Sequence, residues 1–334
     1  MRLVAIAPNP SIDRFFVVDR LRRGAINRPI LEVQVAGGKG LNVARAATAL
    51  GANVSVLTFL AGHAGRWIAD ELAREGVPGT YVRTDGETRT CVTIHDAADG
   101  RLTELYEAGP TVGADDWNRF ETALRAQVND GKVGLVAVSG SLPPGAPPDG
   151  VARIVSIAHA ASVPSIVDAG GEPLALALRA RPWMVKVNIL EAITAAQLAG
   201  IGGPTDQRMP ADDEGVATAL ARALSTRICG PAIITRGSAG AVAAYPDGPT
   251  LHIAPGAIRG RYPVGSGDAF LAGLAAATLA GEPLDLALKL AAGAAAANAL
   301  LPGAGRLNRL EAVSLAESVE ISRVSDEVCS HRGK

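Results

Sequence analysis

The sequence predicts an α/β fold in which a mainly parallel central sheet is covered by helices on both faces. Short apolar runs typical of strands alternate with longer helical patterns over most of the 334 residues. This alternation is typical of parallel strands joined by helical crossovers. The strand runs are almost entirely apolar, as expected for strands that are buried on both faces. Two segments depart from the pattern and predict a second, smaller sheet.

The first half of the chain shows the alternation clearly. We expect strands at residues 3–7 and 54–59, and helices at 41–50 and 65–75. Both helical patterns stop at a glycine, Gly51 and Gly76, which is a common residue just after a helix end. The pattern continues with strands at 134–138, 165–168, 184–187 and 232–235, and with helices at 150–161, 173–179 and 214–224. Alanine-rich packing helices are expected near 268–300.

The two departing segments are residues 14–35 and 88–107. Each contains two runs of alternating polar and apolar residues: "RFFVVDR" and "ILEVQV", then "TRTCVTIHD" and "RLTELYE". Turn residues, Arg23-Gly24 and Asp99-Gly100, separate the runs of each pair. We therefore expect a small antiparallel sheet, either a lid over the site or two edge hairpins. Residues 1–13, 36–87 and 108–322 would form the core, and 323–334 a polar tail.

Composition excludes several classes of function. Lys and Arg total 32 against 33 Asp and Glu, which gives a net charge of −1 without a dense basic block. This balance argues against a nucleic-acid or membrane partner. The longest uncharged apolar run, residues 290–301, is shorter than the ~18 residues of a membrane span. Cys91, Cys229 and Cys329 are odd in number and far apart, which favours reduced thiols and a cytoplasmic protein.

Several common catalytic motifs are absent from the sequence. It contains no GxxxxGK[ST] loop, no GxGxxG after the first strand, no HExxH and no GxSxG. The five histidines show no spacing typical of metal ligands. Two glycine clusters therefore remain as the candidates for a catalytic site.

The first cluster is "VAGGKGLNVARAATALG" at residues 35–51. Gly37 and Gly38 lead into a helix, and glycine N–H groups allow a polar ligand to approach closely. Lys39 adds a positive charge, and Asn42, one turn further, is placed to hydrogen-bond hydroxyl groups. Taken alone, the cluster equally suits a tight turn into a packing helix.

The second cluster is "YPVGSGDAFLAG" at residues 262–273. Gly265, Ser266 and Gly267 are expected to leave backbone N–H groups unpaired at a helix N-terminus, where the helix dipole is positive. These groups form an anion hole for a phosphoryl group in transfer. Asp268 beside them can accept the proton of an attacking hydroxyl. An isolated Gly-Asp pair would more simply be a helix start, but two clusters together favour catalysis.

Together, "AGGKGLNVA" and "VGSGDAFLAG" closely resemble the two motifs of the ribokinase-like (pfkB-type) carbohydrate kinases, in the same order. The resemblance extends over residues 1–322 and implies a three-layer sandwich with a β-sheet lid. It implies transfer of the γ-phosphoryl group of ATP to a sugar hydroxyl, with Asp268 as the base and residues 265–267 as the anion hole.

The resemblance also assigns the nucleotide side. "KVNILE" is similar to the family's N-x-x-E motif, which implies that Asn188 and Glu191 act on Mg²⁺, mostly through water. By spacing alone, these two residues would only cap a helix. Lys186 is expected to reach the nucleotide phosphates. "ITRGSAG" resembles the nucleotide turn, and it adds three further candidates: Thr235, Gly237 and Gly240.

On the sugar side the chain resembles the phosphohexose kinases of this family. The supporting segments are "NPSID", "GETRTCVTI", "EAGP" and "SGSLPPG". The resemblance implies that Asp13 holds sugar hydroxyls and that Arg89 binds the phosphate already on the substrate. Arg28 and Lys39 would complete the basic pocket, and Ser139 lies in the last of these segments. The forked guanidinium of arginine suits a phosphate well.

The expected reaction is ATP-dependent phosphorylation of a ketohexose monophosphate. Fructose 1-phosphate, fructose 6-phosphate and tagatose 6-phosphate are the candidate substrates, with 1-phosphofructokinase activity slightly favoured. A homodimer that pairs through the lid is expected. The alternatives are a kinase of an unphosphorylated sugar or nucleoside, a non-catalytic sensor of the same fold, and a structural protein. The last would leave the glycine clusters unexplained.

The sequence departs from the usual family pattern at four positions. The departures are Val187 for a frequent Pro, Ser266 for a frequent Ala, Pro263 for a common Thr, and an unusual Arg236 beside the nucleotide turn. None of them removes a reacting group.

Overall fold

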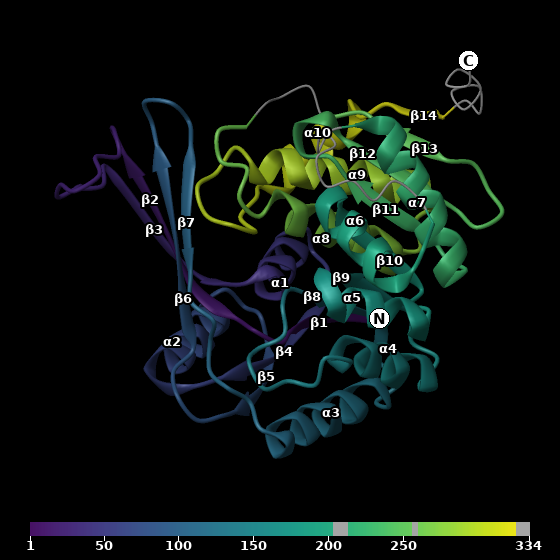
Figure 1. Ribbon diagram of the computed structural model, residues 1–334, viewed down its shortest axis with the longest axis horizontal. Coiled ribbons are helices and arrows are strands. Elements are labelled where there is room, and N and C mark those ends of the chain that lie inside the picture. Colours follow the sequence, from purple (N-terminus) through teal and green to yellow (C-terminus); the bar gives the residue numbers. More distant parts are fainter. Residues whose placement is uncertain (203–212, 256–259, 325–334) are drawn as a thin grey trace.

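The large sheet passes through the middle of the molecule (Figure 1). The computed structural model describes residues 1–202, 213–255 and 260–324. Within these residues the sheet has ten strands, in the order β14-β13-β12-β11-β10-β9-β8-β1-β4-β5. Their bounds are β1 Arg2–Ala7, β4 Val54–Leu60, β5 Gly79–Arg83, β8 Val133–Ser139, β9 Ser165–Asp168, β10 Met184–Asn188, β11 Ala232–Thr235, β12 Ala241–Ala244, β13 Leu251–Ile253 and β14 Ile321–Arg323. Pairing is parallel from β5 to β11 and antiparallel from β11 to β14, which confirms the mainly parallel sheet.

Helices cover both faces of this sheet. They are α1 Lys39–Ala49, α2 Gly62–Arg74, α3 Ala114–Val128, α4 Gly150–Ala160, α5 Gly171–Ala177, α6 Ile189–Ala199, α7 Glu214–Ile228, α8 Ser266–Ala280, α9 Leu284–Asn298 and α10 Arg309–Glu317. Val4 and Ile6 of β1 pack with α3 to α7, whereas Leu3 and Ala5 pack with α1, α2, α8 and α9. Successive side chains of a strand point to opposite faces, so an all-apolar strand fills two cores. The expected three-layer α/β sandwich is confirmed.

The small sheet lies to one side of this body, at the left in Figure 1. It consists of β2 Ser11–Val18, β3 Leu31–Gly37, β6 Arg89–Asp96 and β7 Leu102–Tyr106, in the order β3-β2-β6-β7. Each hairpin is antiparallel, as predicted, but the central pair β2–β6 is parallel. The two strands leave the core side by side, with Ser11 opposite Arg89, and therefore run in the same direction.

Most predicted helices are present, with shifted ends. The first begins at Lys39 rather than at residue 41, because Gly38 has a φ of +90° and the helix starts directly after it. The predicted helix at 173–179 is α5, which a short 3₁₀ turn at Leu178–Ala180 follows. The prediction omitted α3, although its buried Trp117, Phe120 and Leu124 recur at helical spacing.

The C-terminal prediction is tested only in part. Arg323 ends β14, so the large sheet reaches one residue into the predicted tail, and residues 325–334 with Cys329 lie outside the described residues. Cys91 and Cys229 are free thiols. Among the residues described, no helix is both long and apolar enough to span a bilayer.

Candidate active site

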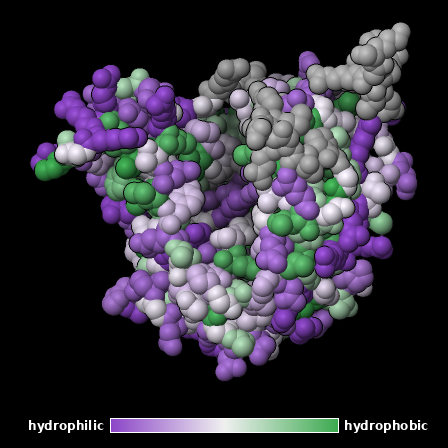
Figure 2. Space-filling model, in the orientation of Figure 1, coloured by the Kyte–Doolittle hydropathy of each residue, from purple (hydrophilic) through white to green (hydrophobic). Residues whose placement is uncertain are grey.

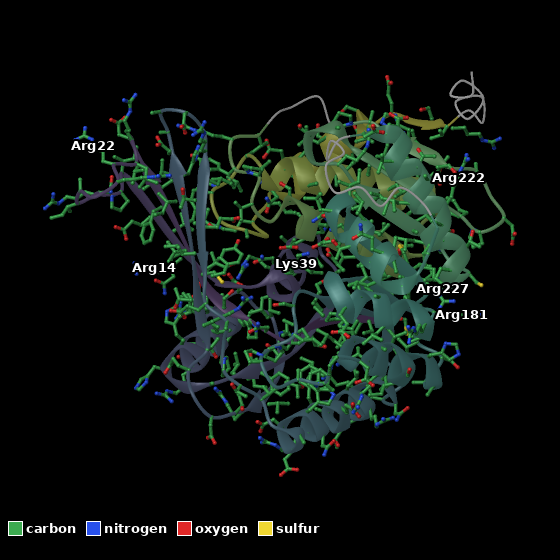
Figure 3. The ribbon with its side chains drawn as sticks, viewed as in Figure 1. Arg14, Arg22, Lys39, Arg181, Arg222 and Arg227 are labelled. Atoms are coloured by element: carbon green, nitrogen blue, oxygen red, sulfur yellow. The ribbon has the colours of Figure 1, made fainter. Side chains whose placement is uncertain are left out.

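Charged and amide side chains meet where several parallel strands of the large sheet end. Asp168 is the last residue of β9, and Lys186 lies two residues before the end of β10. Open parallel sheets form their ligand sites at this edge. The helices α1 and α8 begin nearby, and Figure 3 shows Lys39 at the centre of the molecule, between the small sheet and the core.

Asp268 lies in the first turn of α8 and is only 7% exposed. The helix follows Gly265, whose φ of +82° falls in the left-handed region that glycine favours. A Cβ atom on Gly265 would lie 2.6 Å from Cβ of Ala304, so no larger residue fits there. Both the backbone conformation and the close packing of this turn therefore require a glycine.

The backbone amides before Asp268 are only partly available. The N–H of Ser266 donates to the carbonyl of Pro263 at 3.1 Å, so the expectation of free amides fails at this residue. In the part of the chain that the structure describes, no hydrogen bond engages the N–H groups of Gly267 and Asp268. The first turn of a helix normally leaves such donors free. These two amides, at the positive end of α8, can bind an anion.

Asn42 connects the two glycine clusters. It lies on α1, is 4% exposed, and donates from Nδ2 to Oδ2 of Asp268 at 2.8 Å, across 226 residues of sequence. The first glycine cluster thus supplies a direct partner to the proposed base in the second. The amide is committed to protein groups on both sides, because its Oδ1 accepts from Nη1 of Arg45 at 3.3 Å.

Burial and neighbouring charges set the protonation of Asp268. Burial raises the pKa of Asp268 to about 7, and the negative charge of Asp168 adds to this effect. The positive charges of Lys39 and Lys186 and the hydrogen bond from Asn42 act in the opposite direction. A carboxyl group whose pKa lies near neutrality is suited to general base catalysis.

Asp168 is a site residue that the sequence interpretation missed. It is fully buried, and its two oxygens accept from two lysines: Oδ1 from Lys39 at 3.0 Å and Oδ2 from Lys186 at 2.6 Å. Burial alone would raise the pKa of Asp168, but the two ammonium groups outweigh it and hold that pKa below its ordinary value. The available signal was a carboxylate directly after the apolar strand "SIV".

Glu191 and Asn188 form the start of α6. Oδ1 of Asn188 accepts from the N–H of Glu191 at 2.9 Å, and Oε2 of Glu191 accepts from the N–H of Asn188 at 3.0 Å. This reciprocal pair is the capping box that the spacing predicts. Oε1 of Glu191 also accepts from Nζ of Lys39 at 2.7 Å. Burial would lower the pKa of Lys39, but Asp168 and Glu191 outweigh it and hold that pKa above its ordinary value.

Asp13 lies beside the first glycine cluster, as expected. Its carboxylate accepts from Oγ of Ser11 at 2.5 Å and from the N–H of Gly38 at 3.2 Å. A Cβ atom on Gly37 would overlap this carboxylate, which explains the glycine. Burial raises the pKa of Asp13, and its hydrogen bonds offset this only in part.

Arg89 is the first residue of β6, and its charge acts on the nearby Asp13. Its Nη2 donates to the carbonyl of Asn9 at 3.0 Å and its Nη1 to the carbonyl of Glu107 at 3.2 Å. Among the described residues, Nε of Arg89 and Oγ of the buried Ser139 have no partner. Ser139 ends β8 next to Asp168 in the sheet, and a Cβ atom on the following Gly140 would lie 3.6 Å from Cβ of Lys39. Ser139 therefore lies beside Asp168 and Lys39, and both unpartnered atoms are buried.

The structure does not bring Arg28 to this site. Arg28 is exposed in the connection between β2 and β3, beyond the pair Val17–Leu31, whereas Asp13 lies near the other end of the hairpin. Figure 3 shows Arg22 of the same connection at the outer end of the small sheet. A basic pocket within a single chain therefore lacks this arginine, contrary to the sequence prediction.

The nucleotide-side candidates follow β11. Oγ1 of Thr235 donates to the carbonyl of Val187 at 3.3 Å, which joins this turn to the end of β10. Gly237 has a φ of +57° and open space around it. Gly240 has a φ of +86°, and a Cβ atom there would overlap the carbonyl of Ile253. The unusual Arg236 is buried against Glu214 and His252.

A cavity lies between the small sheet and the core. Its walls include Asp13, Cys91 and Tyr106 from the small sheet, and Val264 and Ala304 from the core. Figure 2 shows a hollow between the two parts, with hydrophilic residues at its base. The space between the small sheet and the core therefore has a polar floor and a partly apolar wall.

No protein cage for a metal ion is present among the described residues. No group of three or more His, Cys, Asp or Glu side chains is suitably placed there. Asp168 and Glu191 are both paired with lysines. Asp168 is completely buried, whereas the Glu191 side chain is 21% exposed and could contact an ion that phosphates and water hold.

A buried carboxylate beside free helix amides, with two lysines whose charges act on it, is an arrangement that suits phosphoryl transfer. Comparison with known proteins identifies the family. The family model described as "pfkB family carbohydrate kinase" matches residues 5–310. The chain therefore belongs to the pfkB family of carbohydrate kinases, and it is a kinase that transfers phosphoryl groups.

Solved structures share the fold at low sequence identity. A protein named "possible 1-phosphofructokinase" from Thermotoga maritima superposes with a TM-score of 0.83 and 22% identity, covering 97% of this chain and 100% of that one. Phosphofructokinase-2 from Escherichia coli gives 0.78 and 24%, with 95% and 98% covered. Ribokinase from Arabidopsis thaliana gives 0.69 and 23%, with 94% and 98% covered.

Proposed function

We propose that this kinase transfers the γ-phosphoryl group of ATP to a free hydroxyl of a ketohexose monophosphate. Fructose 1-phosphate, fructose 6-phosphate and tagatose 6-phosphate are the candidate acceptors, with fructose 1-phosphate favoured. The observation that carries the proposal is the position of Asp268, buried beside free amides of α8 and hydrogen-bonded to Asn42. The names of two structural relatives, a 1-phosphofructokinase and phosphofructokinase-2, support a phosphorylated acceptor.

In the proposed reaction, Asp268 removes the proton of the attacking hydroxyl. Its pKa of about 7 allows it to be ionised before the reaction and to hold the proton afterwards. The N–H groups of Gly267 and Asp268 stabilise the charge that develops on the transferring group. Lys186 lies close enough to Gly267 to add its positive charge to theirs.

The nucleotide enters this proposal as MgATP, so that the ion arrives with its substrate. Mg²⁺ keeps much of its water and prefers phosphate and carboxylate oxygens. Glu191 is a partly exposed carboxylate that pairs with Lys39 and would act through water, with Asn188 fixing its position by the capping box. Thr235, Gly237 and Gly240 would border the nucleotide.

On the acceptor side, Arg89 would bind the phosphate of the sugar, and Lys39 would add a second positive charge. Asp13 and the Gly38 backbone would orient hydroxyls, and Ser139, which lies beside Asp168 at the end of β8, would contact one of them. The small sheet would act as a lid, because its inner face borders the cavity that contains Asp13. Exclusion of water matters, since water competes with the sugar for the phosphoryl group.

We also propose a homodimer that pairs through the small sheet. β7 is an edge strand, and its Leu105 and Tyr106 are 62% and 58% exposed. An unpaired edge with large apolar side chains favours association. One relative, phosphofructokinase-2 from Escherichia coli, has a tetrameric inhibited form. A cytoplasmic location completes the proposal, and the free thiols of Cys91 and Cys229 are compatible with it.

The test is a panel of phosphorylated and plain sugars incubated with MgATP, with ADP release as the readout. We expect ADP with one or more ketohexose monophosphates, and loss of turnover in Asp268→Asn by about 10²–10⁴-fold. Arg89→Ala should raise the KM of the phosphosugar and leave that of ATP nearly unchanged. Turnover of a plain sugar that Arg89→Ala does not affect would favour the unphosphorylated acceptor. Binding without any ADP release would favour a sensor.

A further inference from the structure

Arg45 is a buried arginine that has no role in the proposed mechanism. It lies on α1, one turn after Asn42, and is only 8% exposed. Its Nε donates to Oε1 of Glu75 at 2.7 Å, and its Nη2 donates to the carbonyl of Ala36. Burial of a guanidinium is costly unless it is paired and hydrogen-bonded, and Glu75 and the carbonyl of Ala36 meet this requirement.

Arg45 begins a chain of hydrogen bonds that ends at Asp268. Nη1 of Arg45 donates to Oδ1 of Asn42 at 3.3 Å, and Nδ2 of Asn42 donates to Oδ2 of Asp268 at 2.8 Å. A guanidinium can only donate, so it fixes which end of the Asn42 amide faces it. The NH₂ end must then face Asp268. Arg45 therefore determines that the base receives a hydrogen-bond donor and not an acceptor.

A second contact leads from Arg45 to the start of α8. Nη1 also donates to the carbonyl of Ala304 at 3.0 Å. Ala304 packs against Gly265, and a Cβ atom on the following Gly305 would lie 2.6 Å from the carbonyl oxygen of Asn42. The guanidinium thus holds both the Asn42 amide and the turn that supports the first residues of α8.

We propose that Arg45 is a positioning residue for phosphoryl transfer, which aligns Asp268 through the Asn42 amide. The inference rests on the proposed function, because it assigns a supporting residue to the same base. A donor directed at Asp268 stabilises the ionised carboxylate and fixes its orientation toward the acceptor hydroxyl. Arg45 does not touch substrate in this role, and Glu75 holds it in place.

The first test is Arg45→Lys, assayed with the best acceptor from the sugar panel. A lysine keeps the charge but lacks the fork that reaches Glu75, Asn42 and Ala304 together. We expect kcat to fall by about 10-fold, with the KM of both substrates changed by less than about 2-fold. The acid limb of the pH profile should move upward by about half a pH unit, because the Asn42 donor is no longer held toward the carboxylate.

Three charged groups act on Asp268 and remain in Arg45→Lys. They are Asp168 from β9, Lys186 from β10 and Lys39 from α1. An upward move of the acid limb in this variant therefore reports the Asn42 contact. Phe120→Leu, in the core cluster beneath α3, is the matched control for lost stability. It should leave the acid limb in place.

A double-mutant cycle separates positioning from general support. In an Asn42→Ala background, Arg45→Lys should change kcat by less than about 3-fold, because the connection is already broken. An equal loss in both backgrounds would show that Arg45 acts independently of Asn42, and the inference would be wrong. If Arg45→Lys fails to fold, Glu75→Gln replaces it. That variant should show a smaller loss of kcat with the same dependence on Asn42.

A readout without turnover keeps the two proposals distinguishable. The carboxyl carbon of Asp268, labelled with ¹³C and assigned by its absence in Asp268→Asn, reports the pKa directly. We expect this pKa to rise in Arg45→Lys even if no sugar of the panel releases ADP. A missing shift together with normal turnover would overturn the role of Arg45 and leave the kinase assignment intact.

Discussion

Gly267 and Lys186 approach so closely that a Cβ atom on the glycine would lie 3.2 Å from Nζ of the lysine. The lysine cannot easily withdraw, because Asp168 holds its Nζ at 2.6 Å. The first turn of α8 therefore meets a fixed ammonium group, and the gap between them suits an anion and not a side chain.

Gly267→Ala tests this gap. We expect the KM of ATP to rise and kcat to fall, together by about 10-fold in kcat/KM, because the methyl group displaces Lys186 or the bound phosphate. Stability should stay unchanged or increase, since alanine favours a helix more than glycine by ~1 kcal/mol. Gly215→Ala, at the second position of α7, is the matched control. If both variants kept full kcat/KM, the gap would have no role in binding.

The pH dependence of the reaction should report Asp268. The base works when ionised, and burial raises the pKa of Asp268 to about 7. We therefore expect kcat/KM to fall as the pH drops through about 7 and to level off above about 8. The measurement is ADP release between pH 5.5 and 9 at constant ionic strength. An acid limb near pH 4 would show that another group, or a well-solvated carboxylate, serves as the base.

The same carboxylate should reduce stability at neutral pH. The pKa of Asp268 is raised from 3.8 in the unfolded chain to about 7 in the folded one. Its contribution is fully present below about pH 4 and is lost as the pH rises through about 7. At pH 8 the free energy of unfolding of Asp268→Asn, measured with urea, should therefore exceed that of wild type by about 2–4 kcal/mol. At pH 4 the two free energies should be nearly equal. Asp247→Asn, at an exposed position, is the control and should show no such trend.

Asp168→Asn should damage both stability and activity. It would leave Lys39 and Lys186 close together without the carboxylate that they share. Loss of one partner in a buried ion pair typically costs about 3–5 kcal/mol. Because the pKa of Asp168 is lowered from 3.8 in the fold, the difference from wild type should be present above about pH 4 and shrink only as the pH falls further. Urea unfolding at pH 7 and at about pH 2.5 measures it, and a constant difference would contradict this account.

The fold could be predicted where a strand is apolar on both sides and therefore packs against two hydrophobic cores. The apolar run of β1 left few alternatives, because Leu3 and Ile6 face opposite layers of helices. The parallel pairing of β2 with β6 could not be predicted, since it joins residues almost 80 positions apart. The sequence shows two hairpins and does not show which of their strands become neighbours.

The candidate site was predictable where a backbone feature required a particular residue. Gly265 and Gly38 adopt a positive φ that few other residues tolerate, so the motifs themselves identify the two helix starts. Asp168 and Arg45 could not be identified from the sequence, because most of their partners lie on other elements. Arg28 was placed wrongly because the distance of a residue along a hairpin depends on the register, which the sequence does not reveal.

Ser11, Gly37 and Arg89 are paired neighbours on β2, β3 and β6, and they form one row where the small sheet joins the core. Val17 lies six positions after Ser11, so the outer end of the sheet lies ~20 Å from that row. Rotation by about 10° about the row would carry the outer end through ~3.5 Å, by the same strand geometry, while Arg89 would stay nearly in place. If Arg89 anchors the sugar phosphate as proposed, the pivot and the anchor would coincide, so the small sheet could open while Arg89 kept its contact with that phosphate.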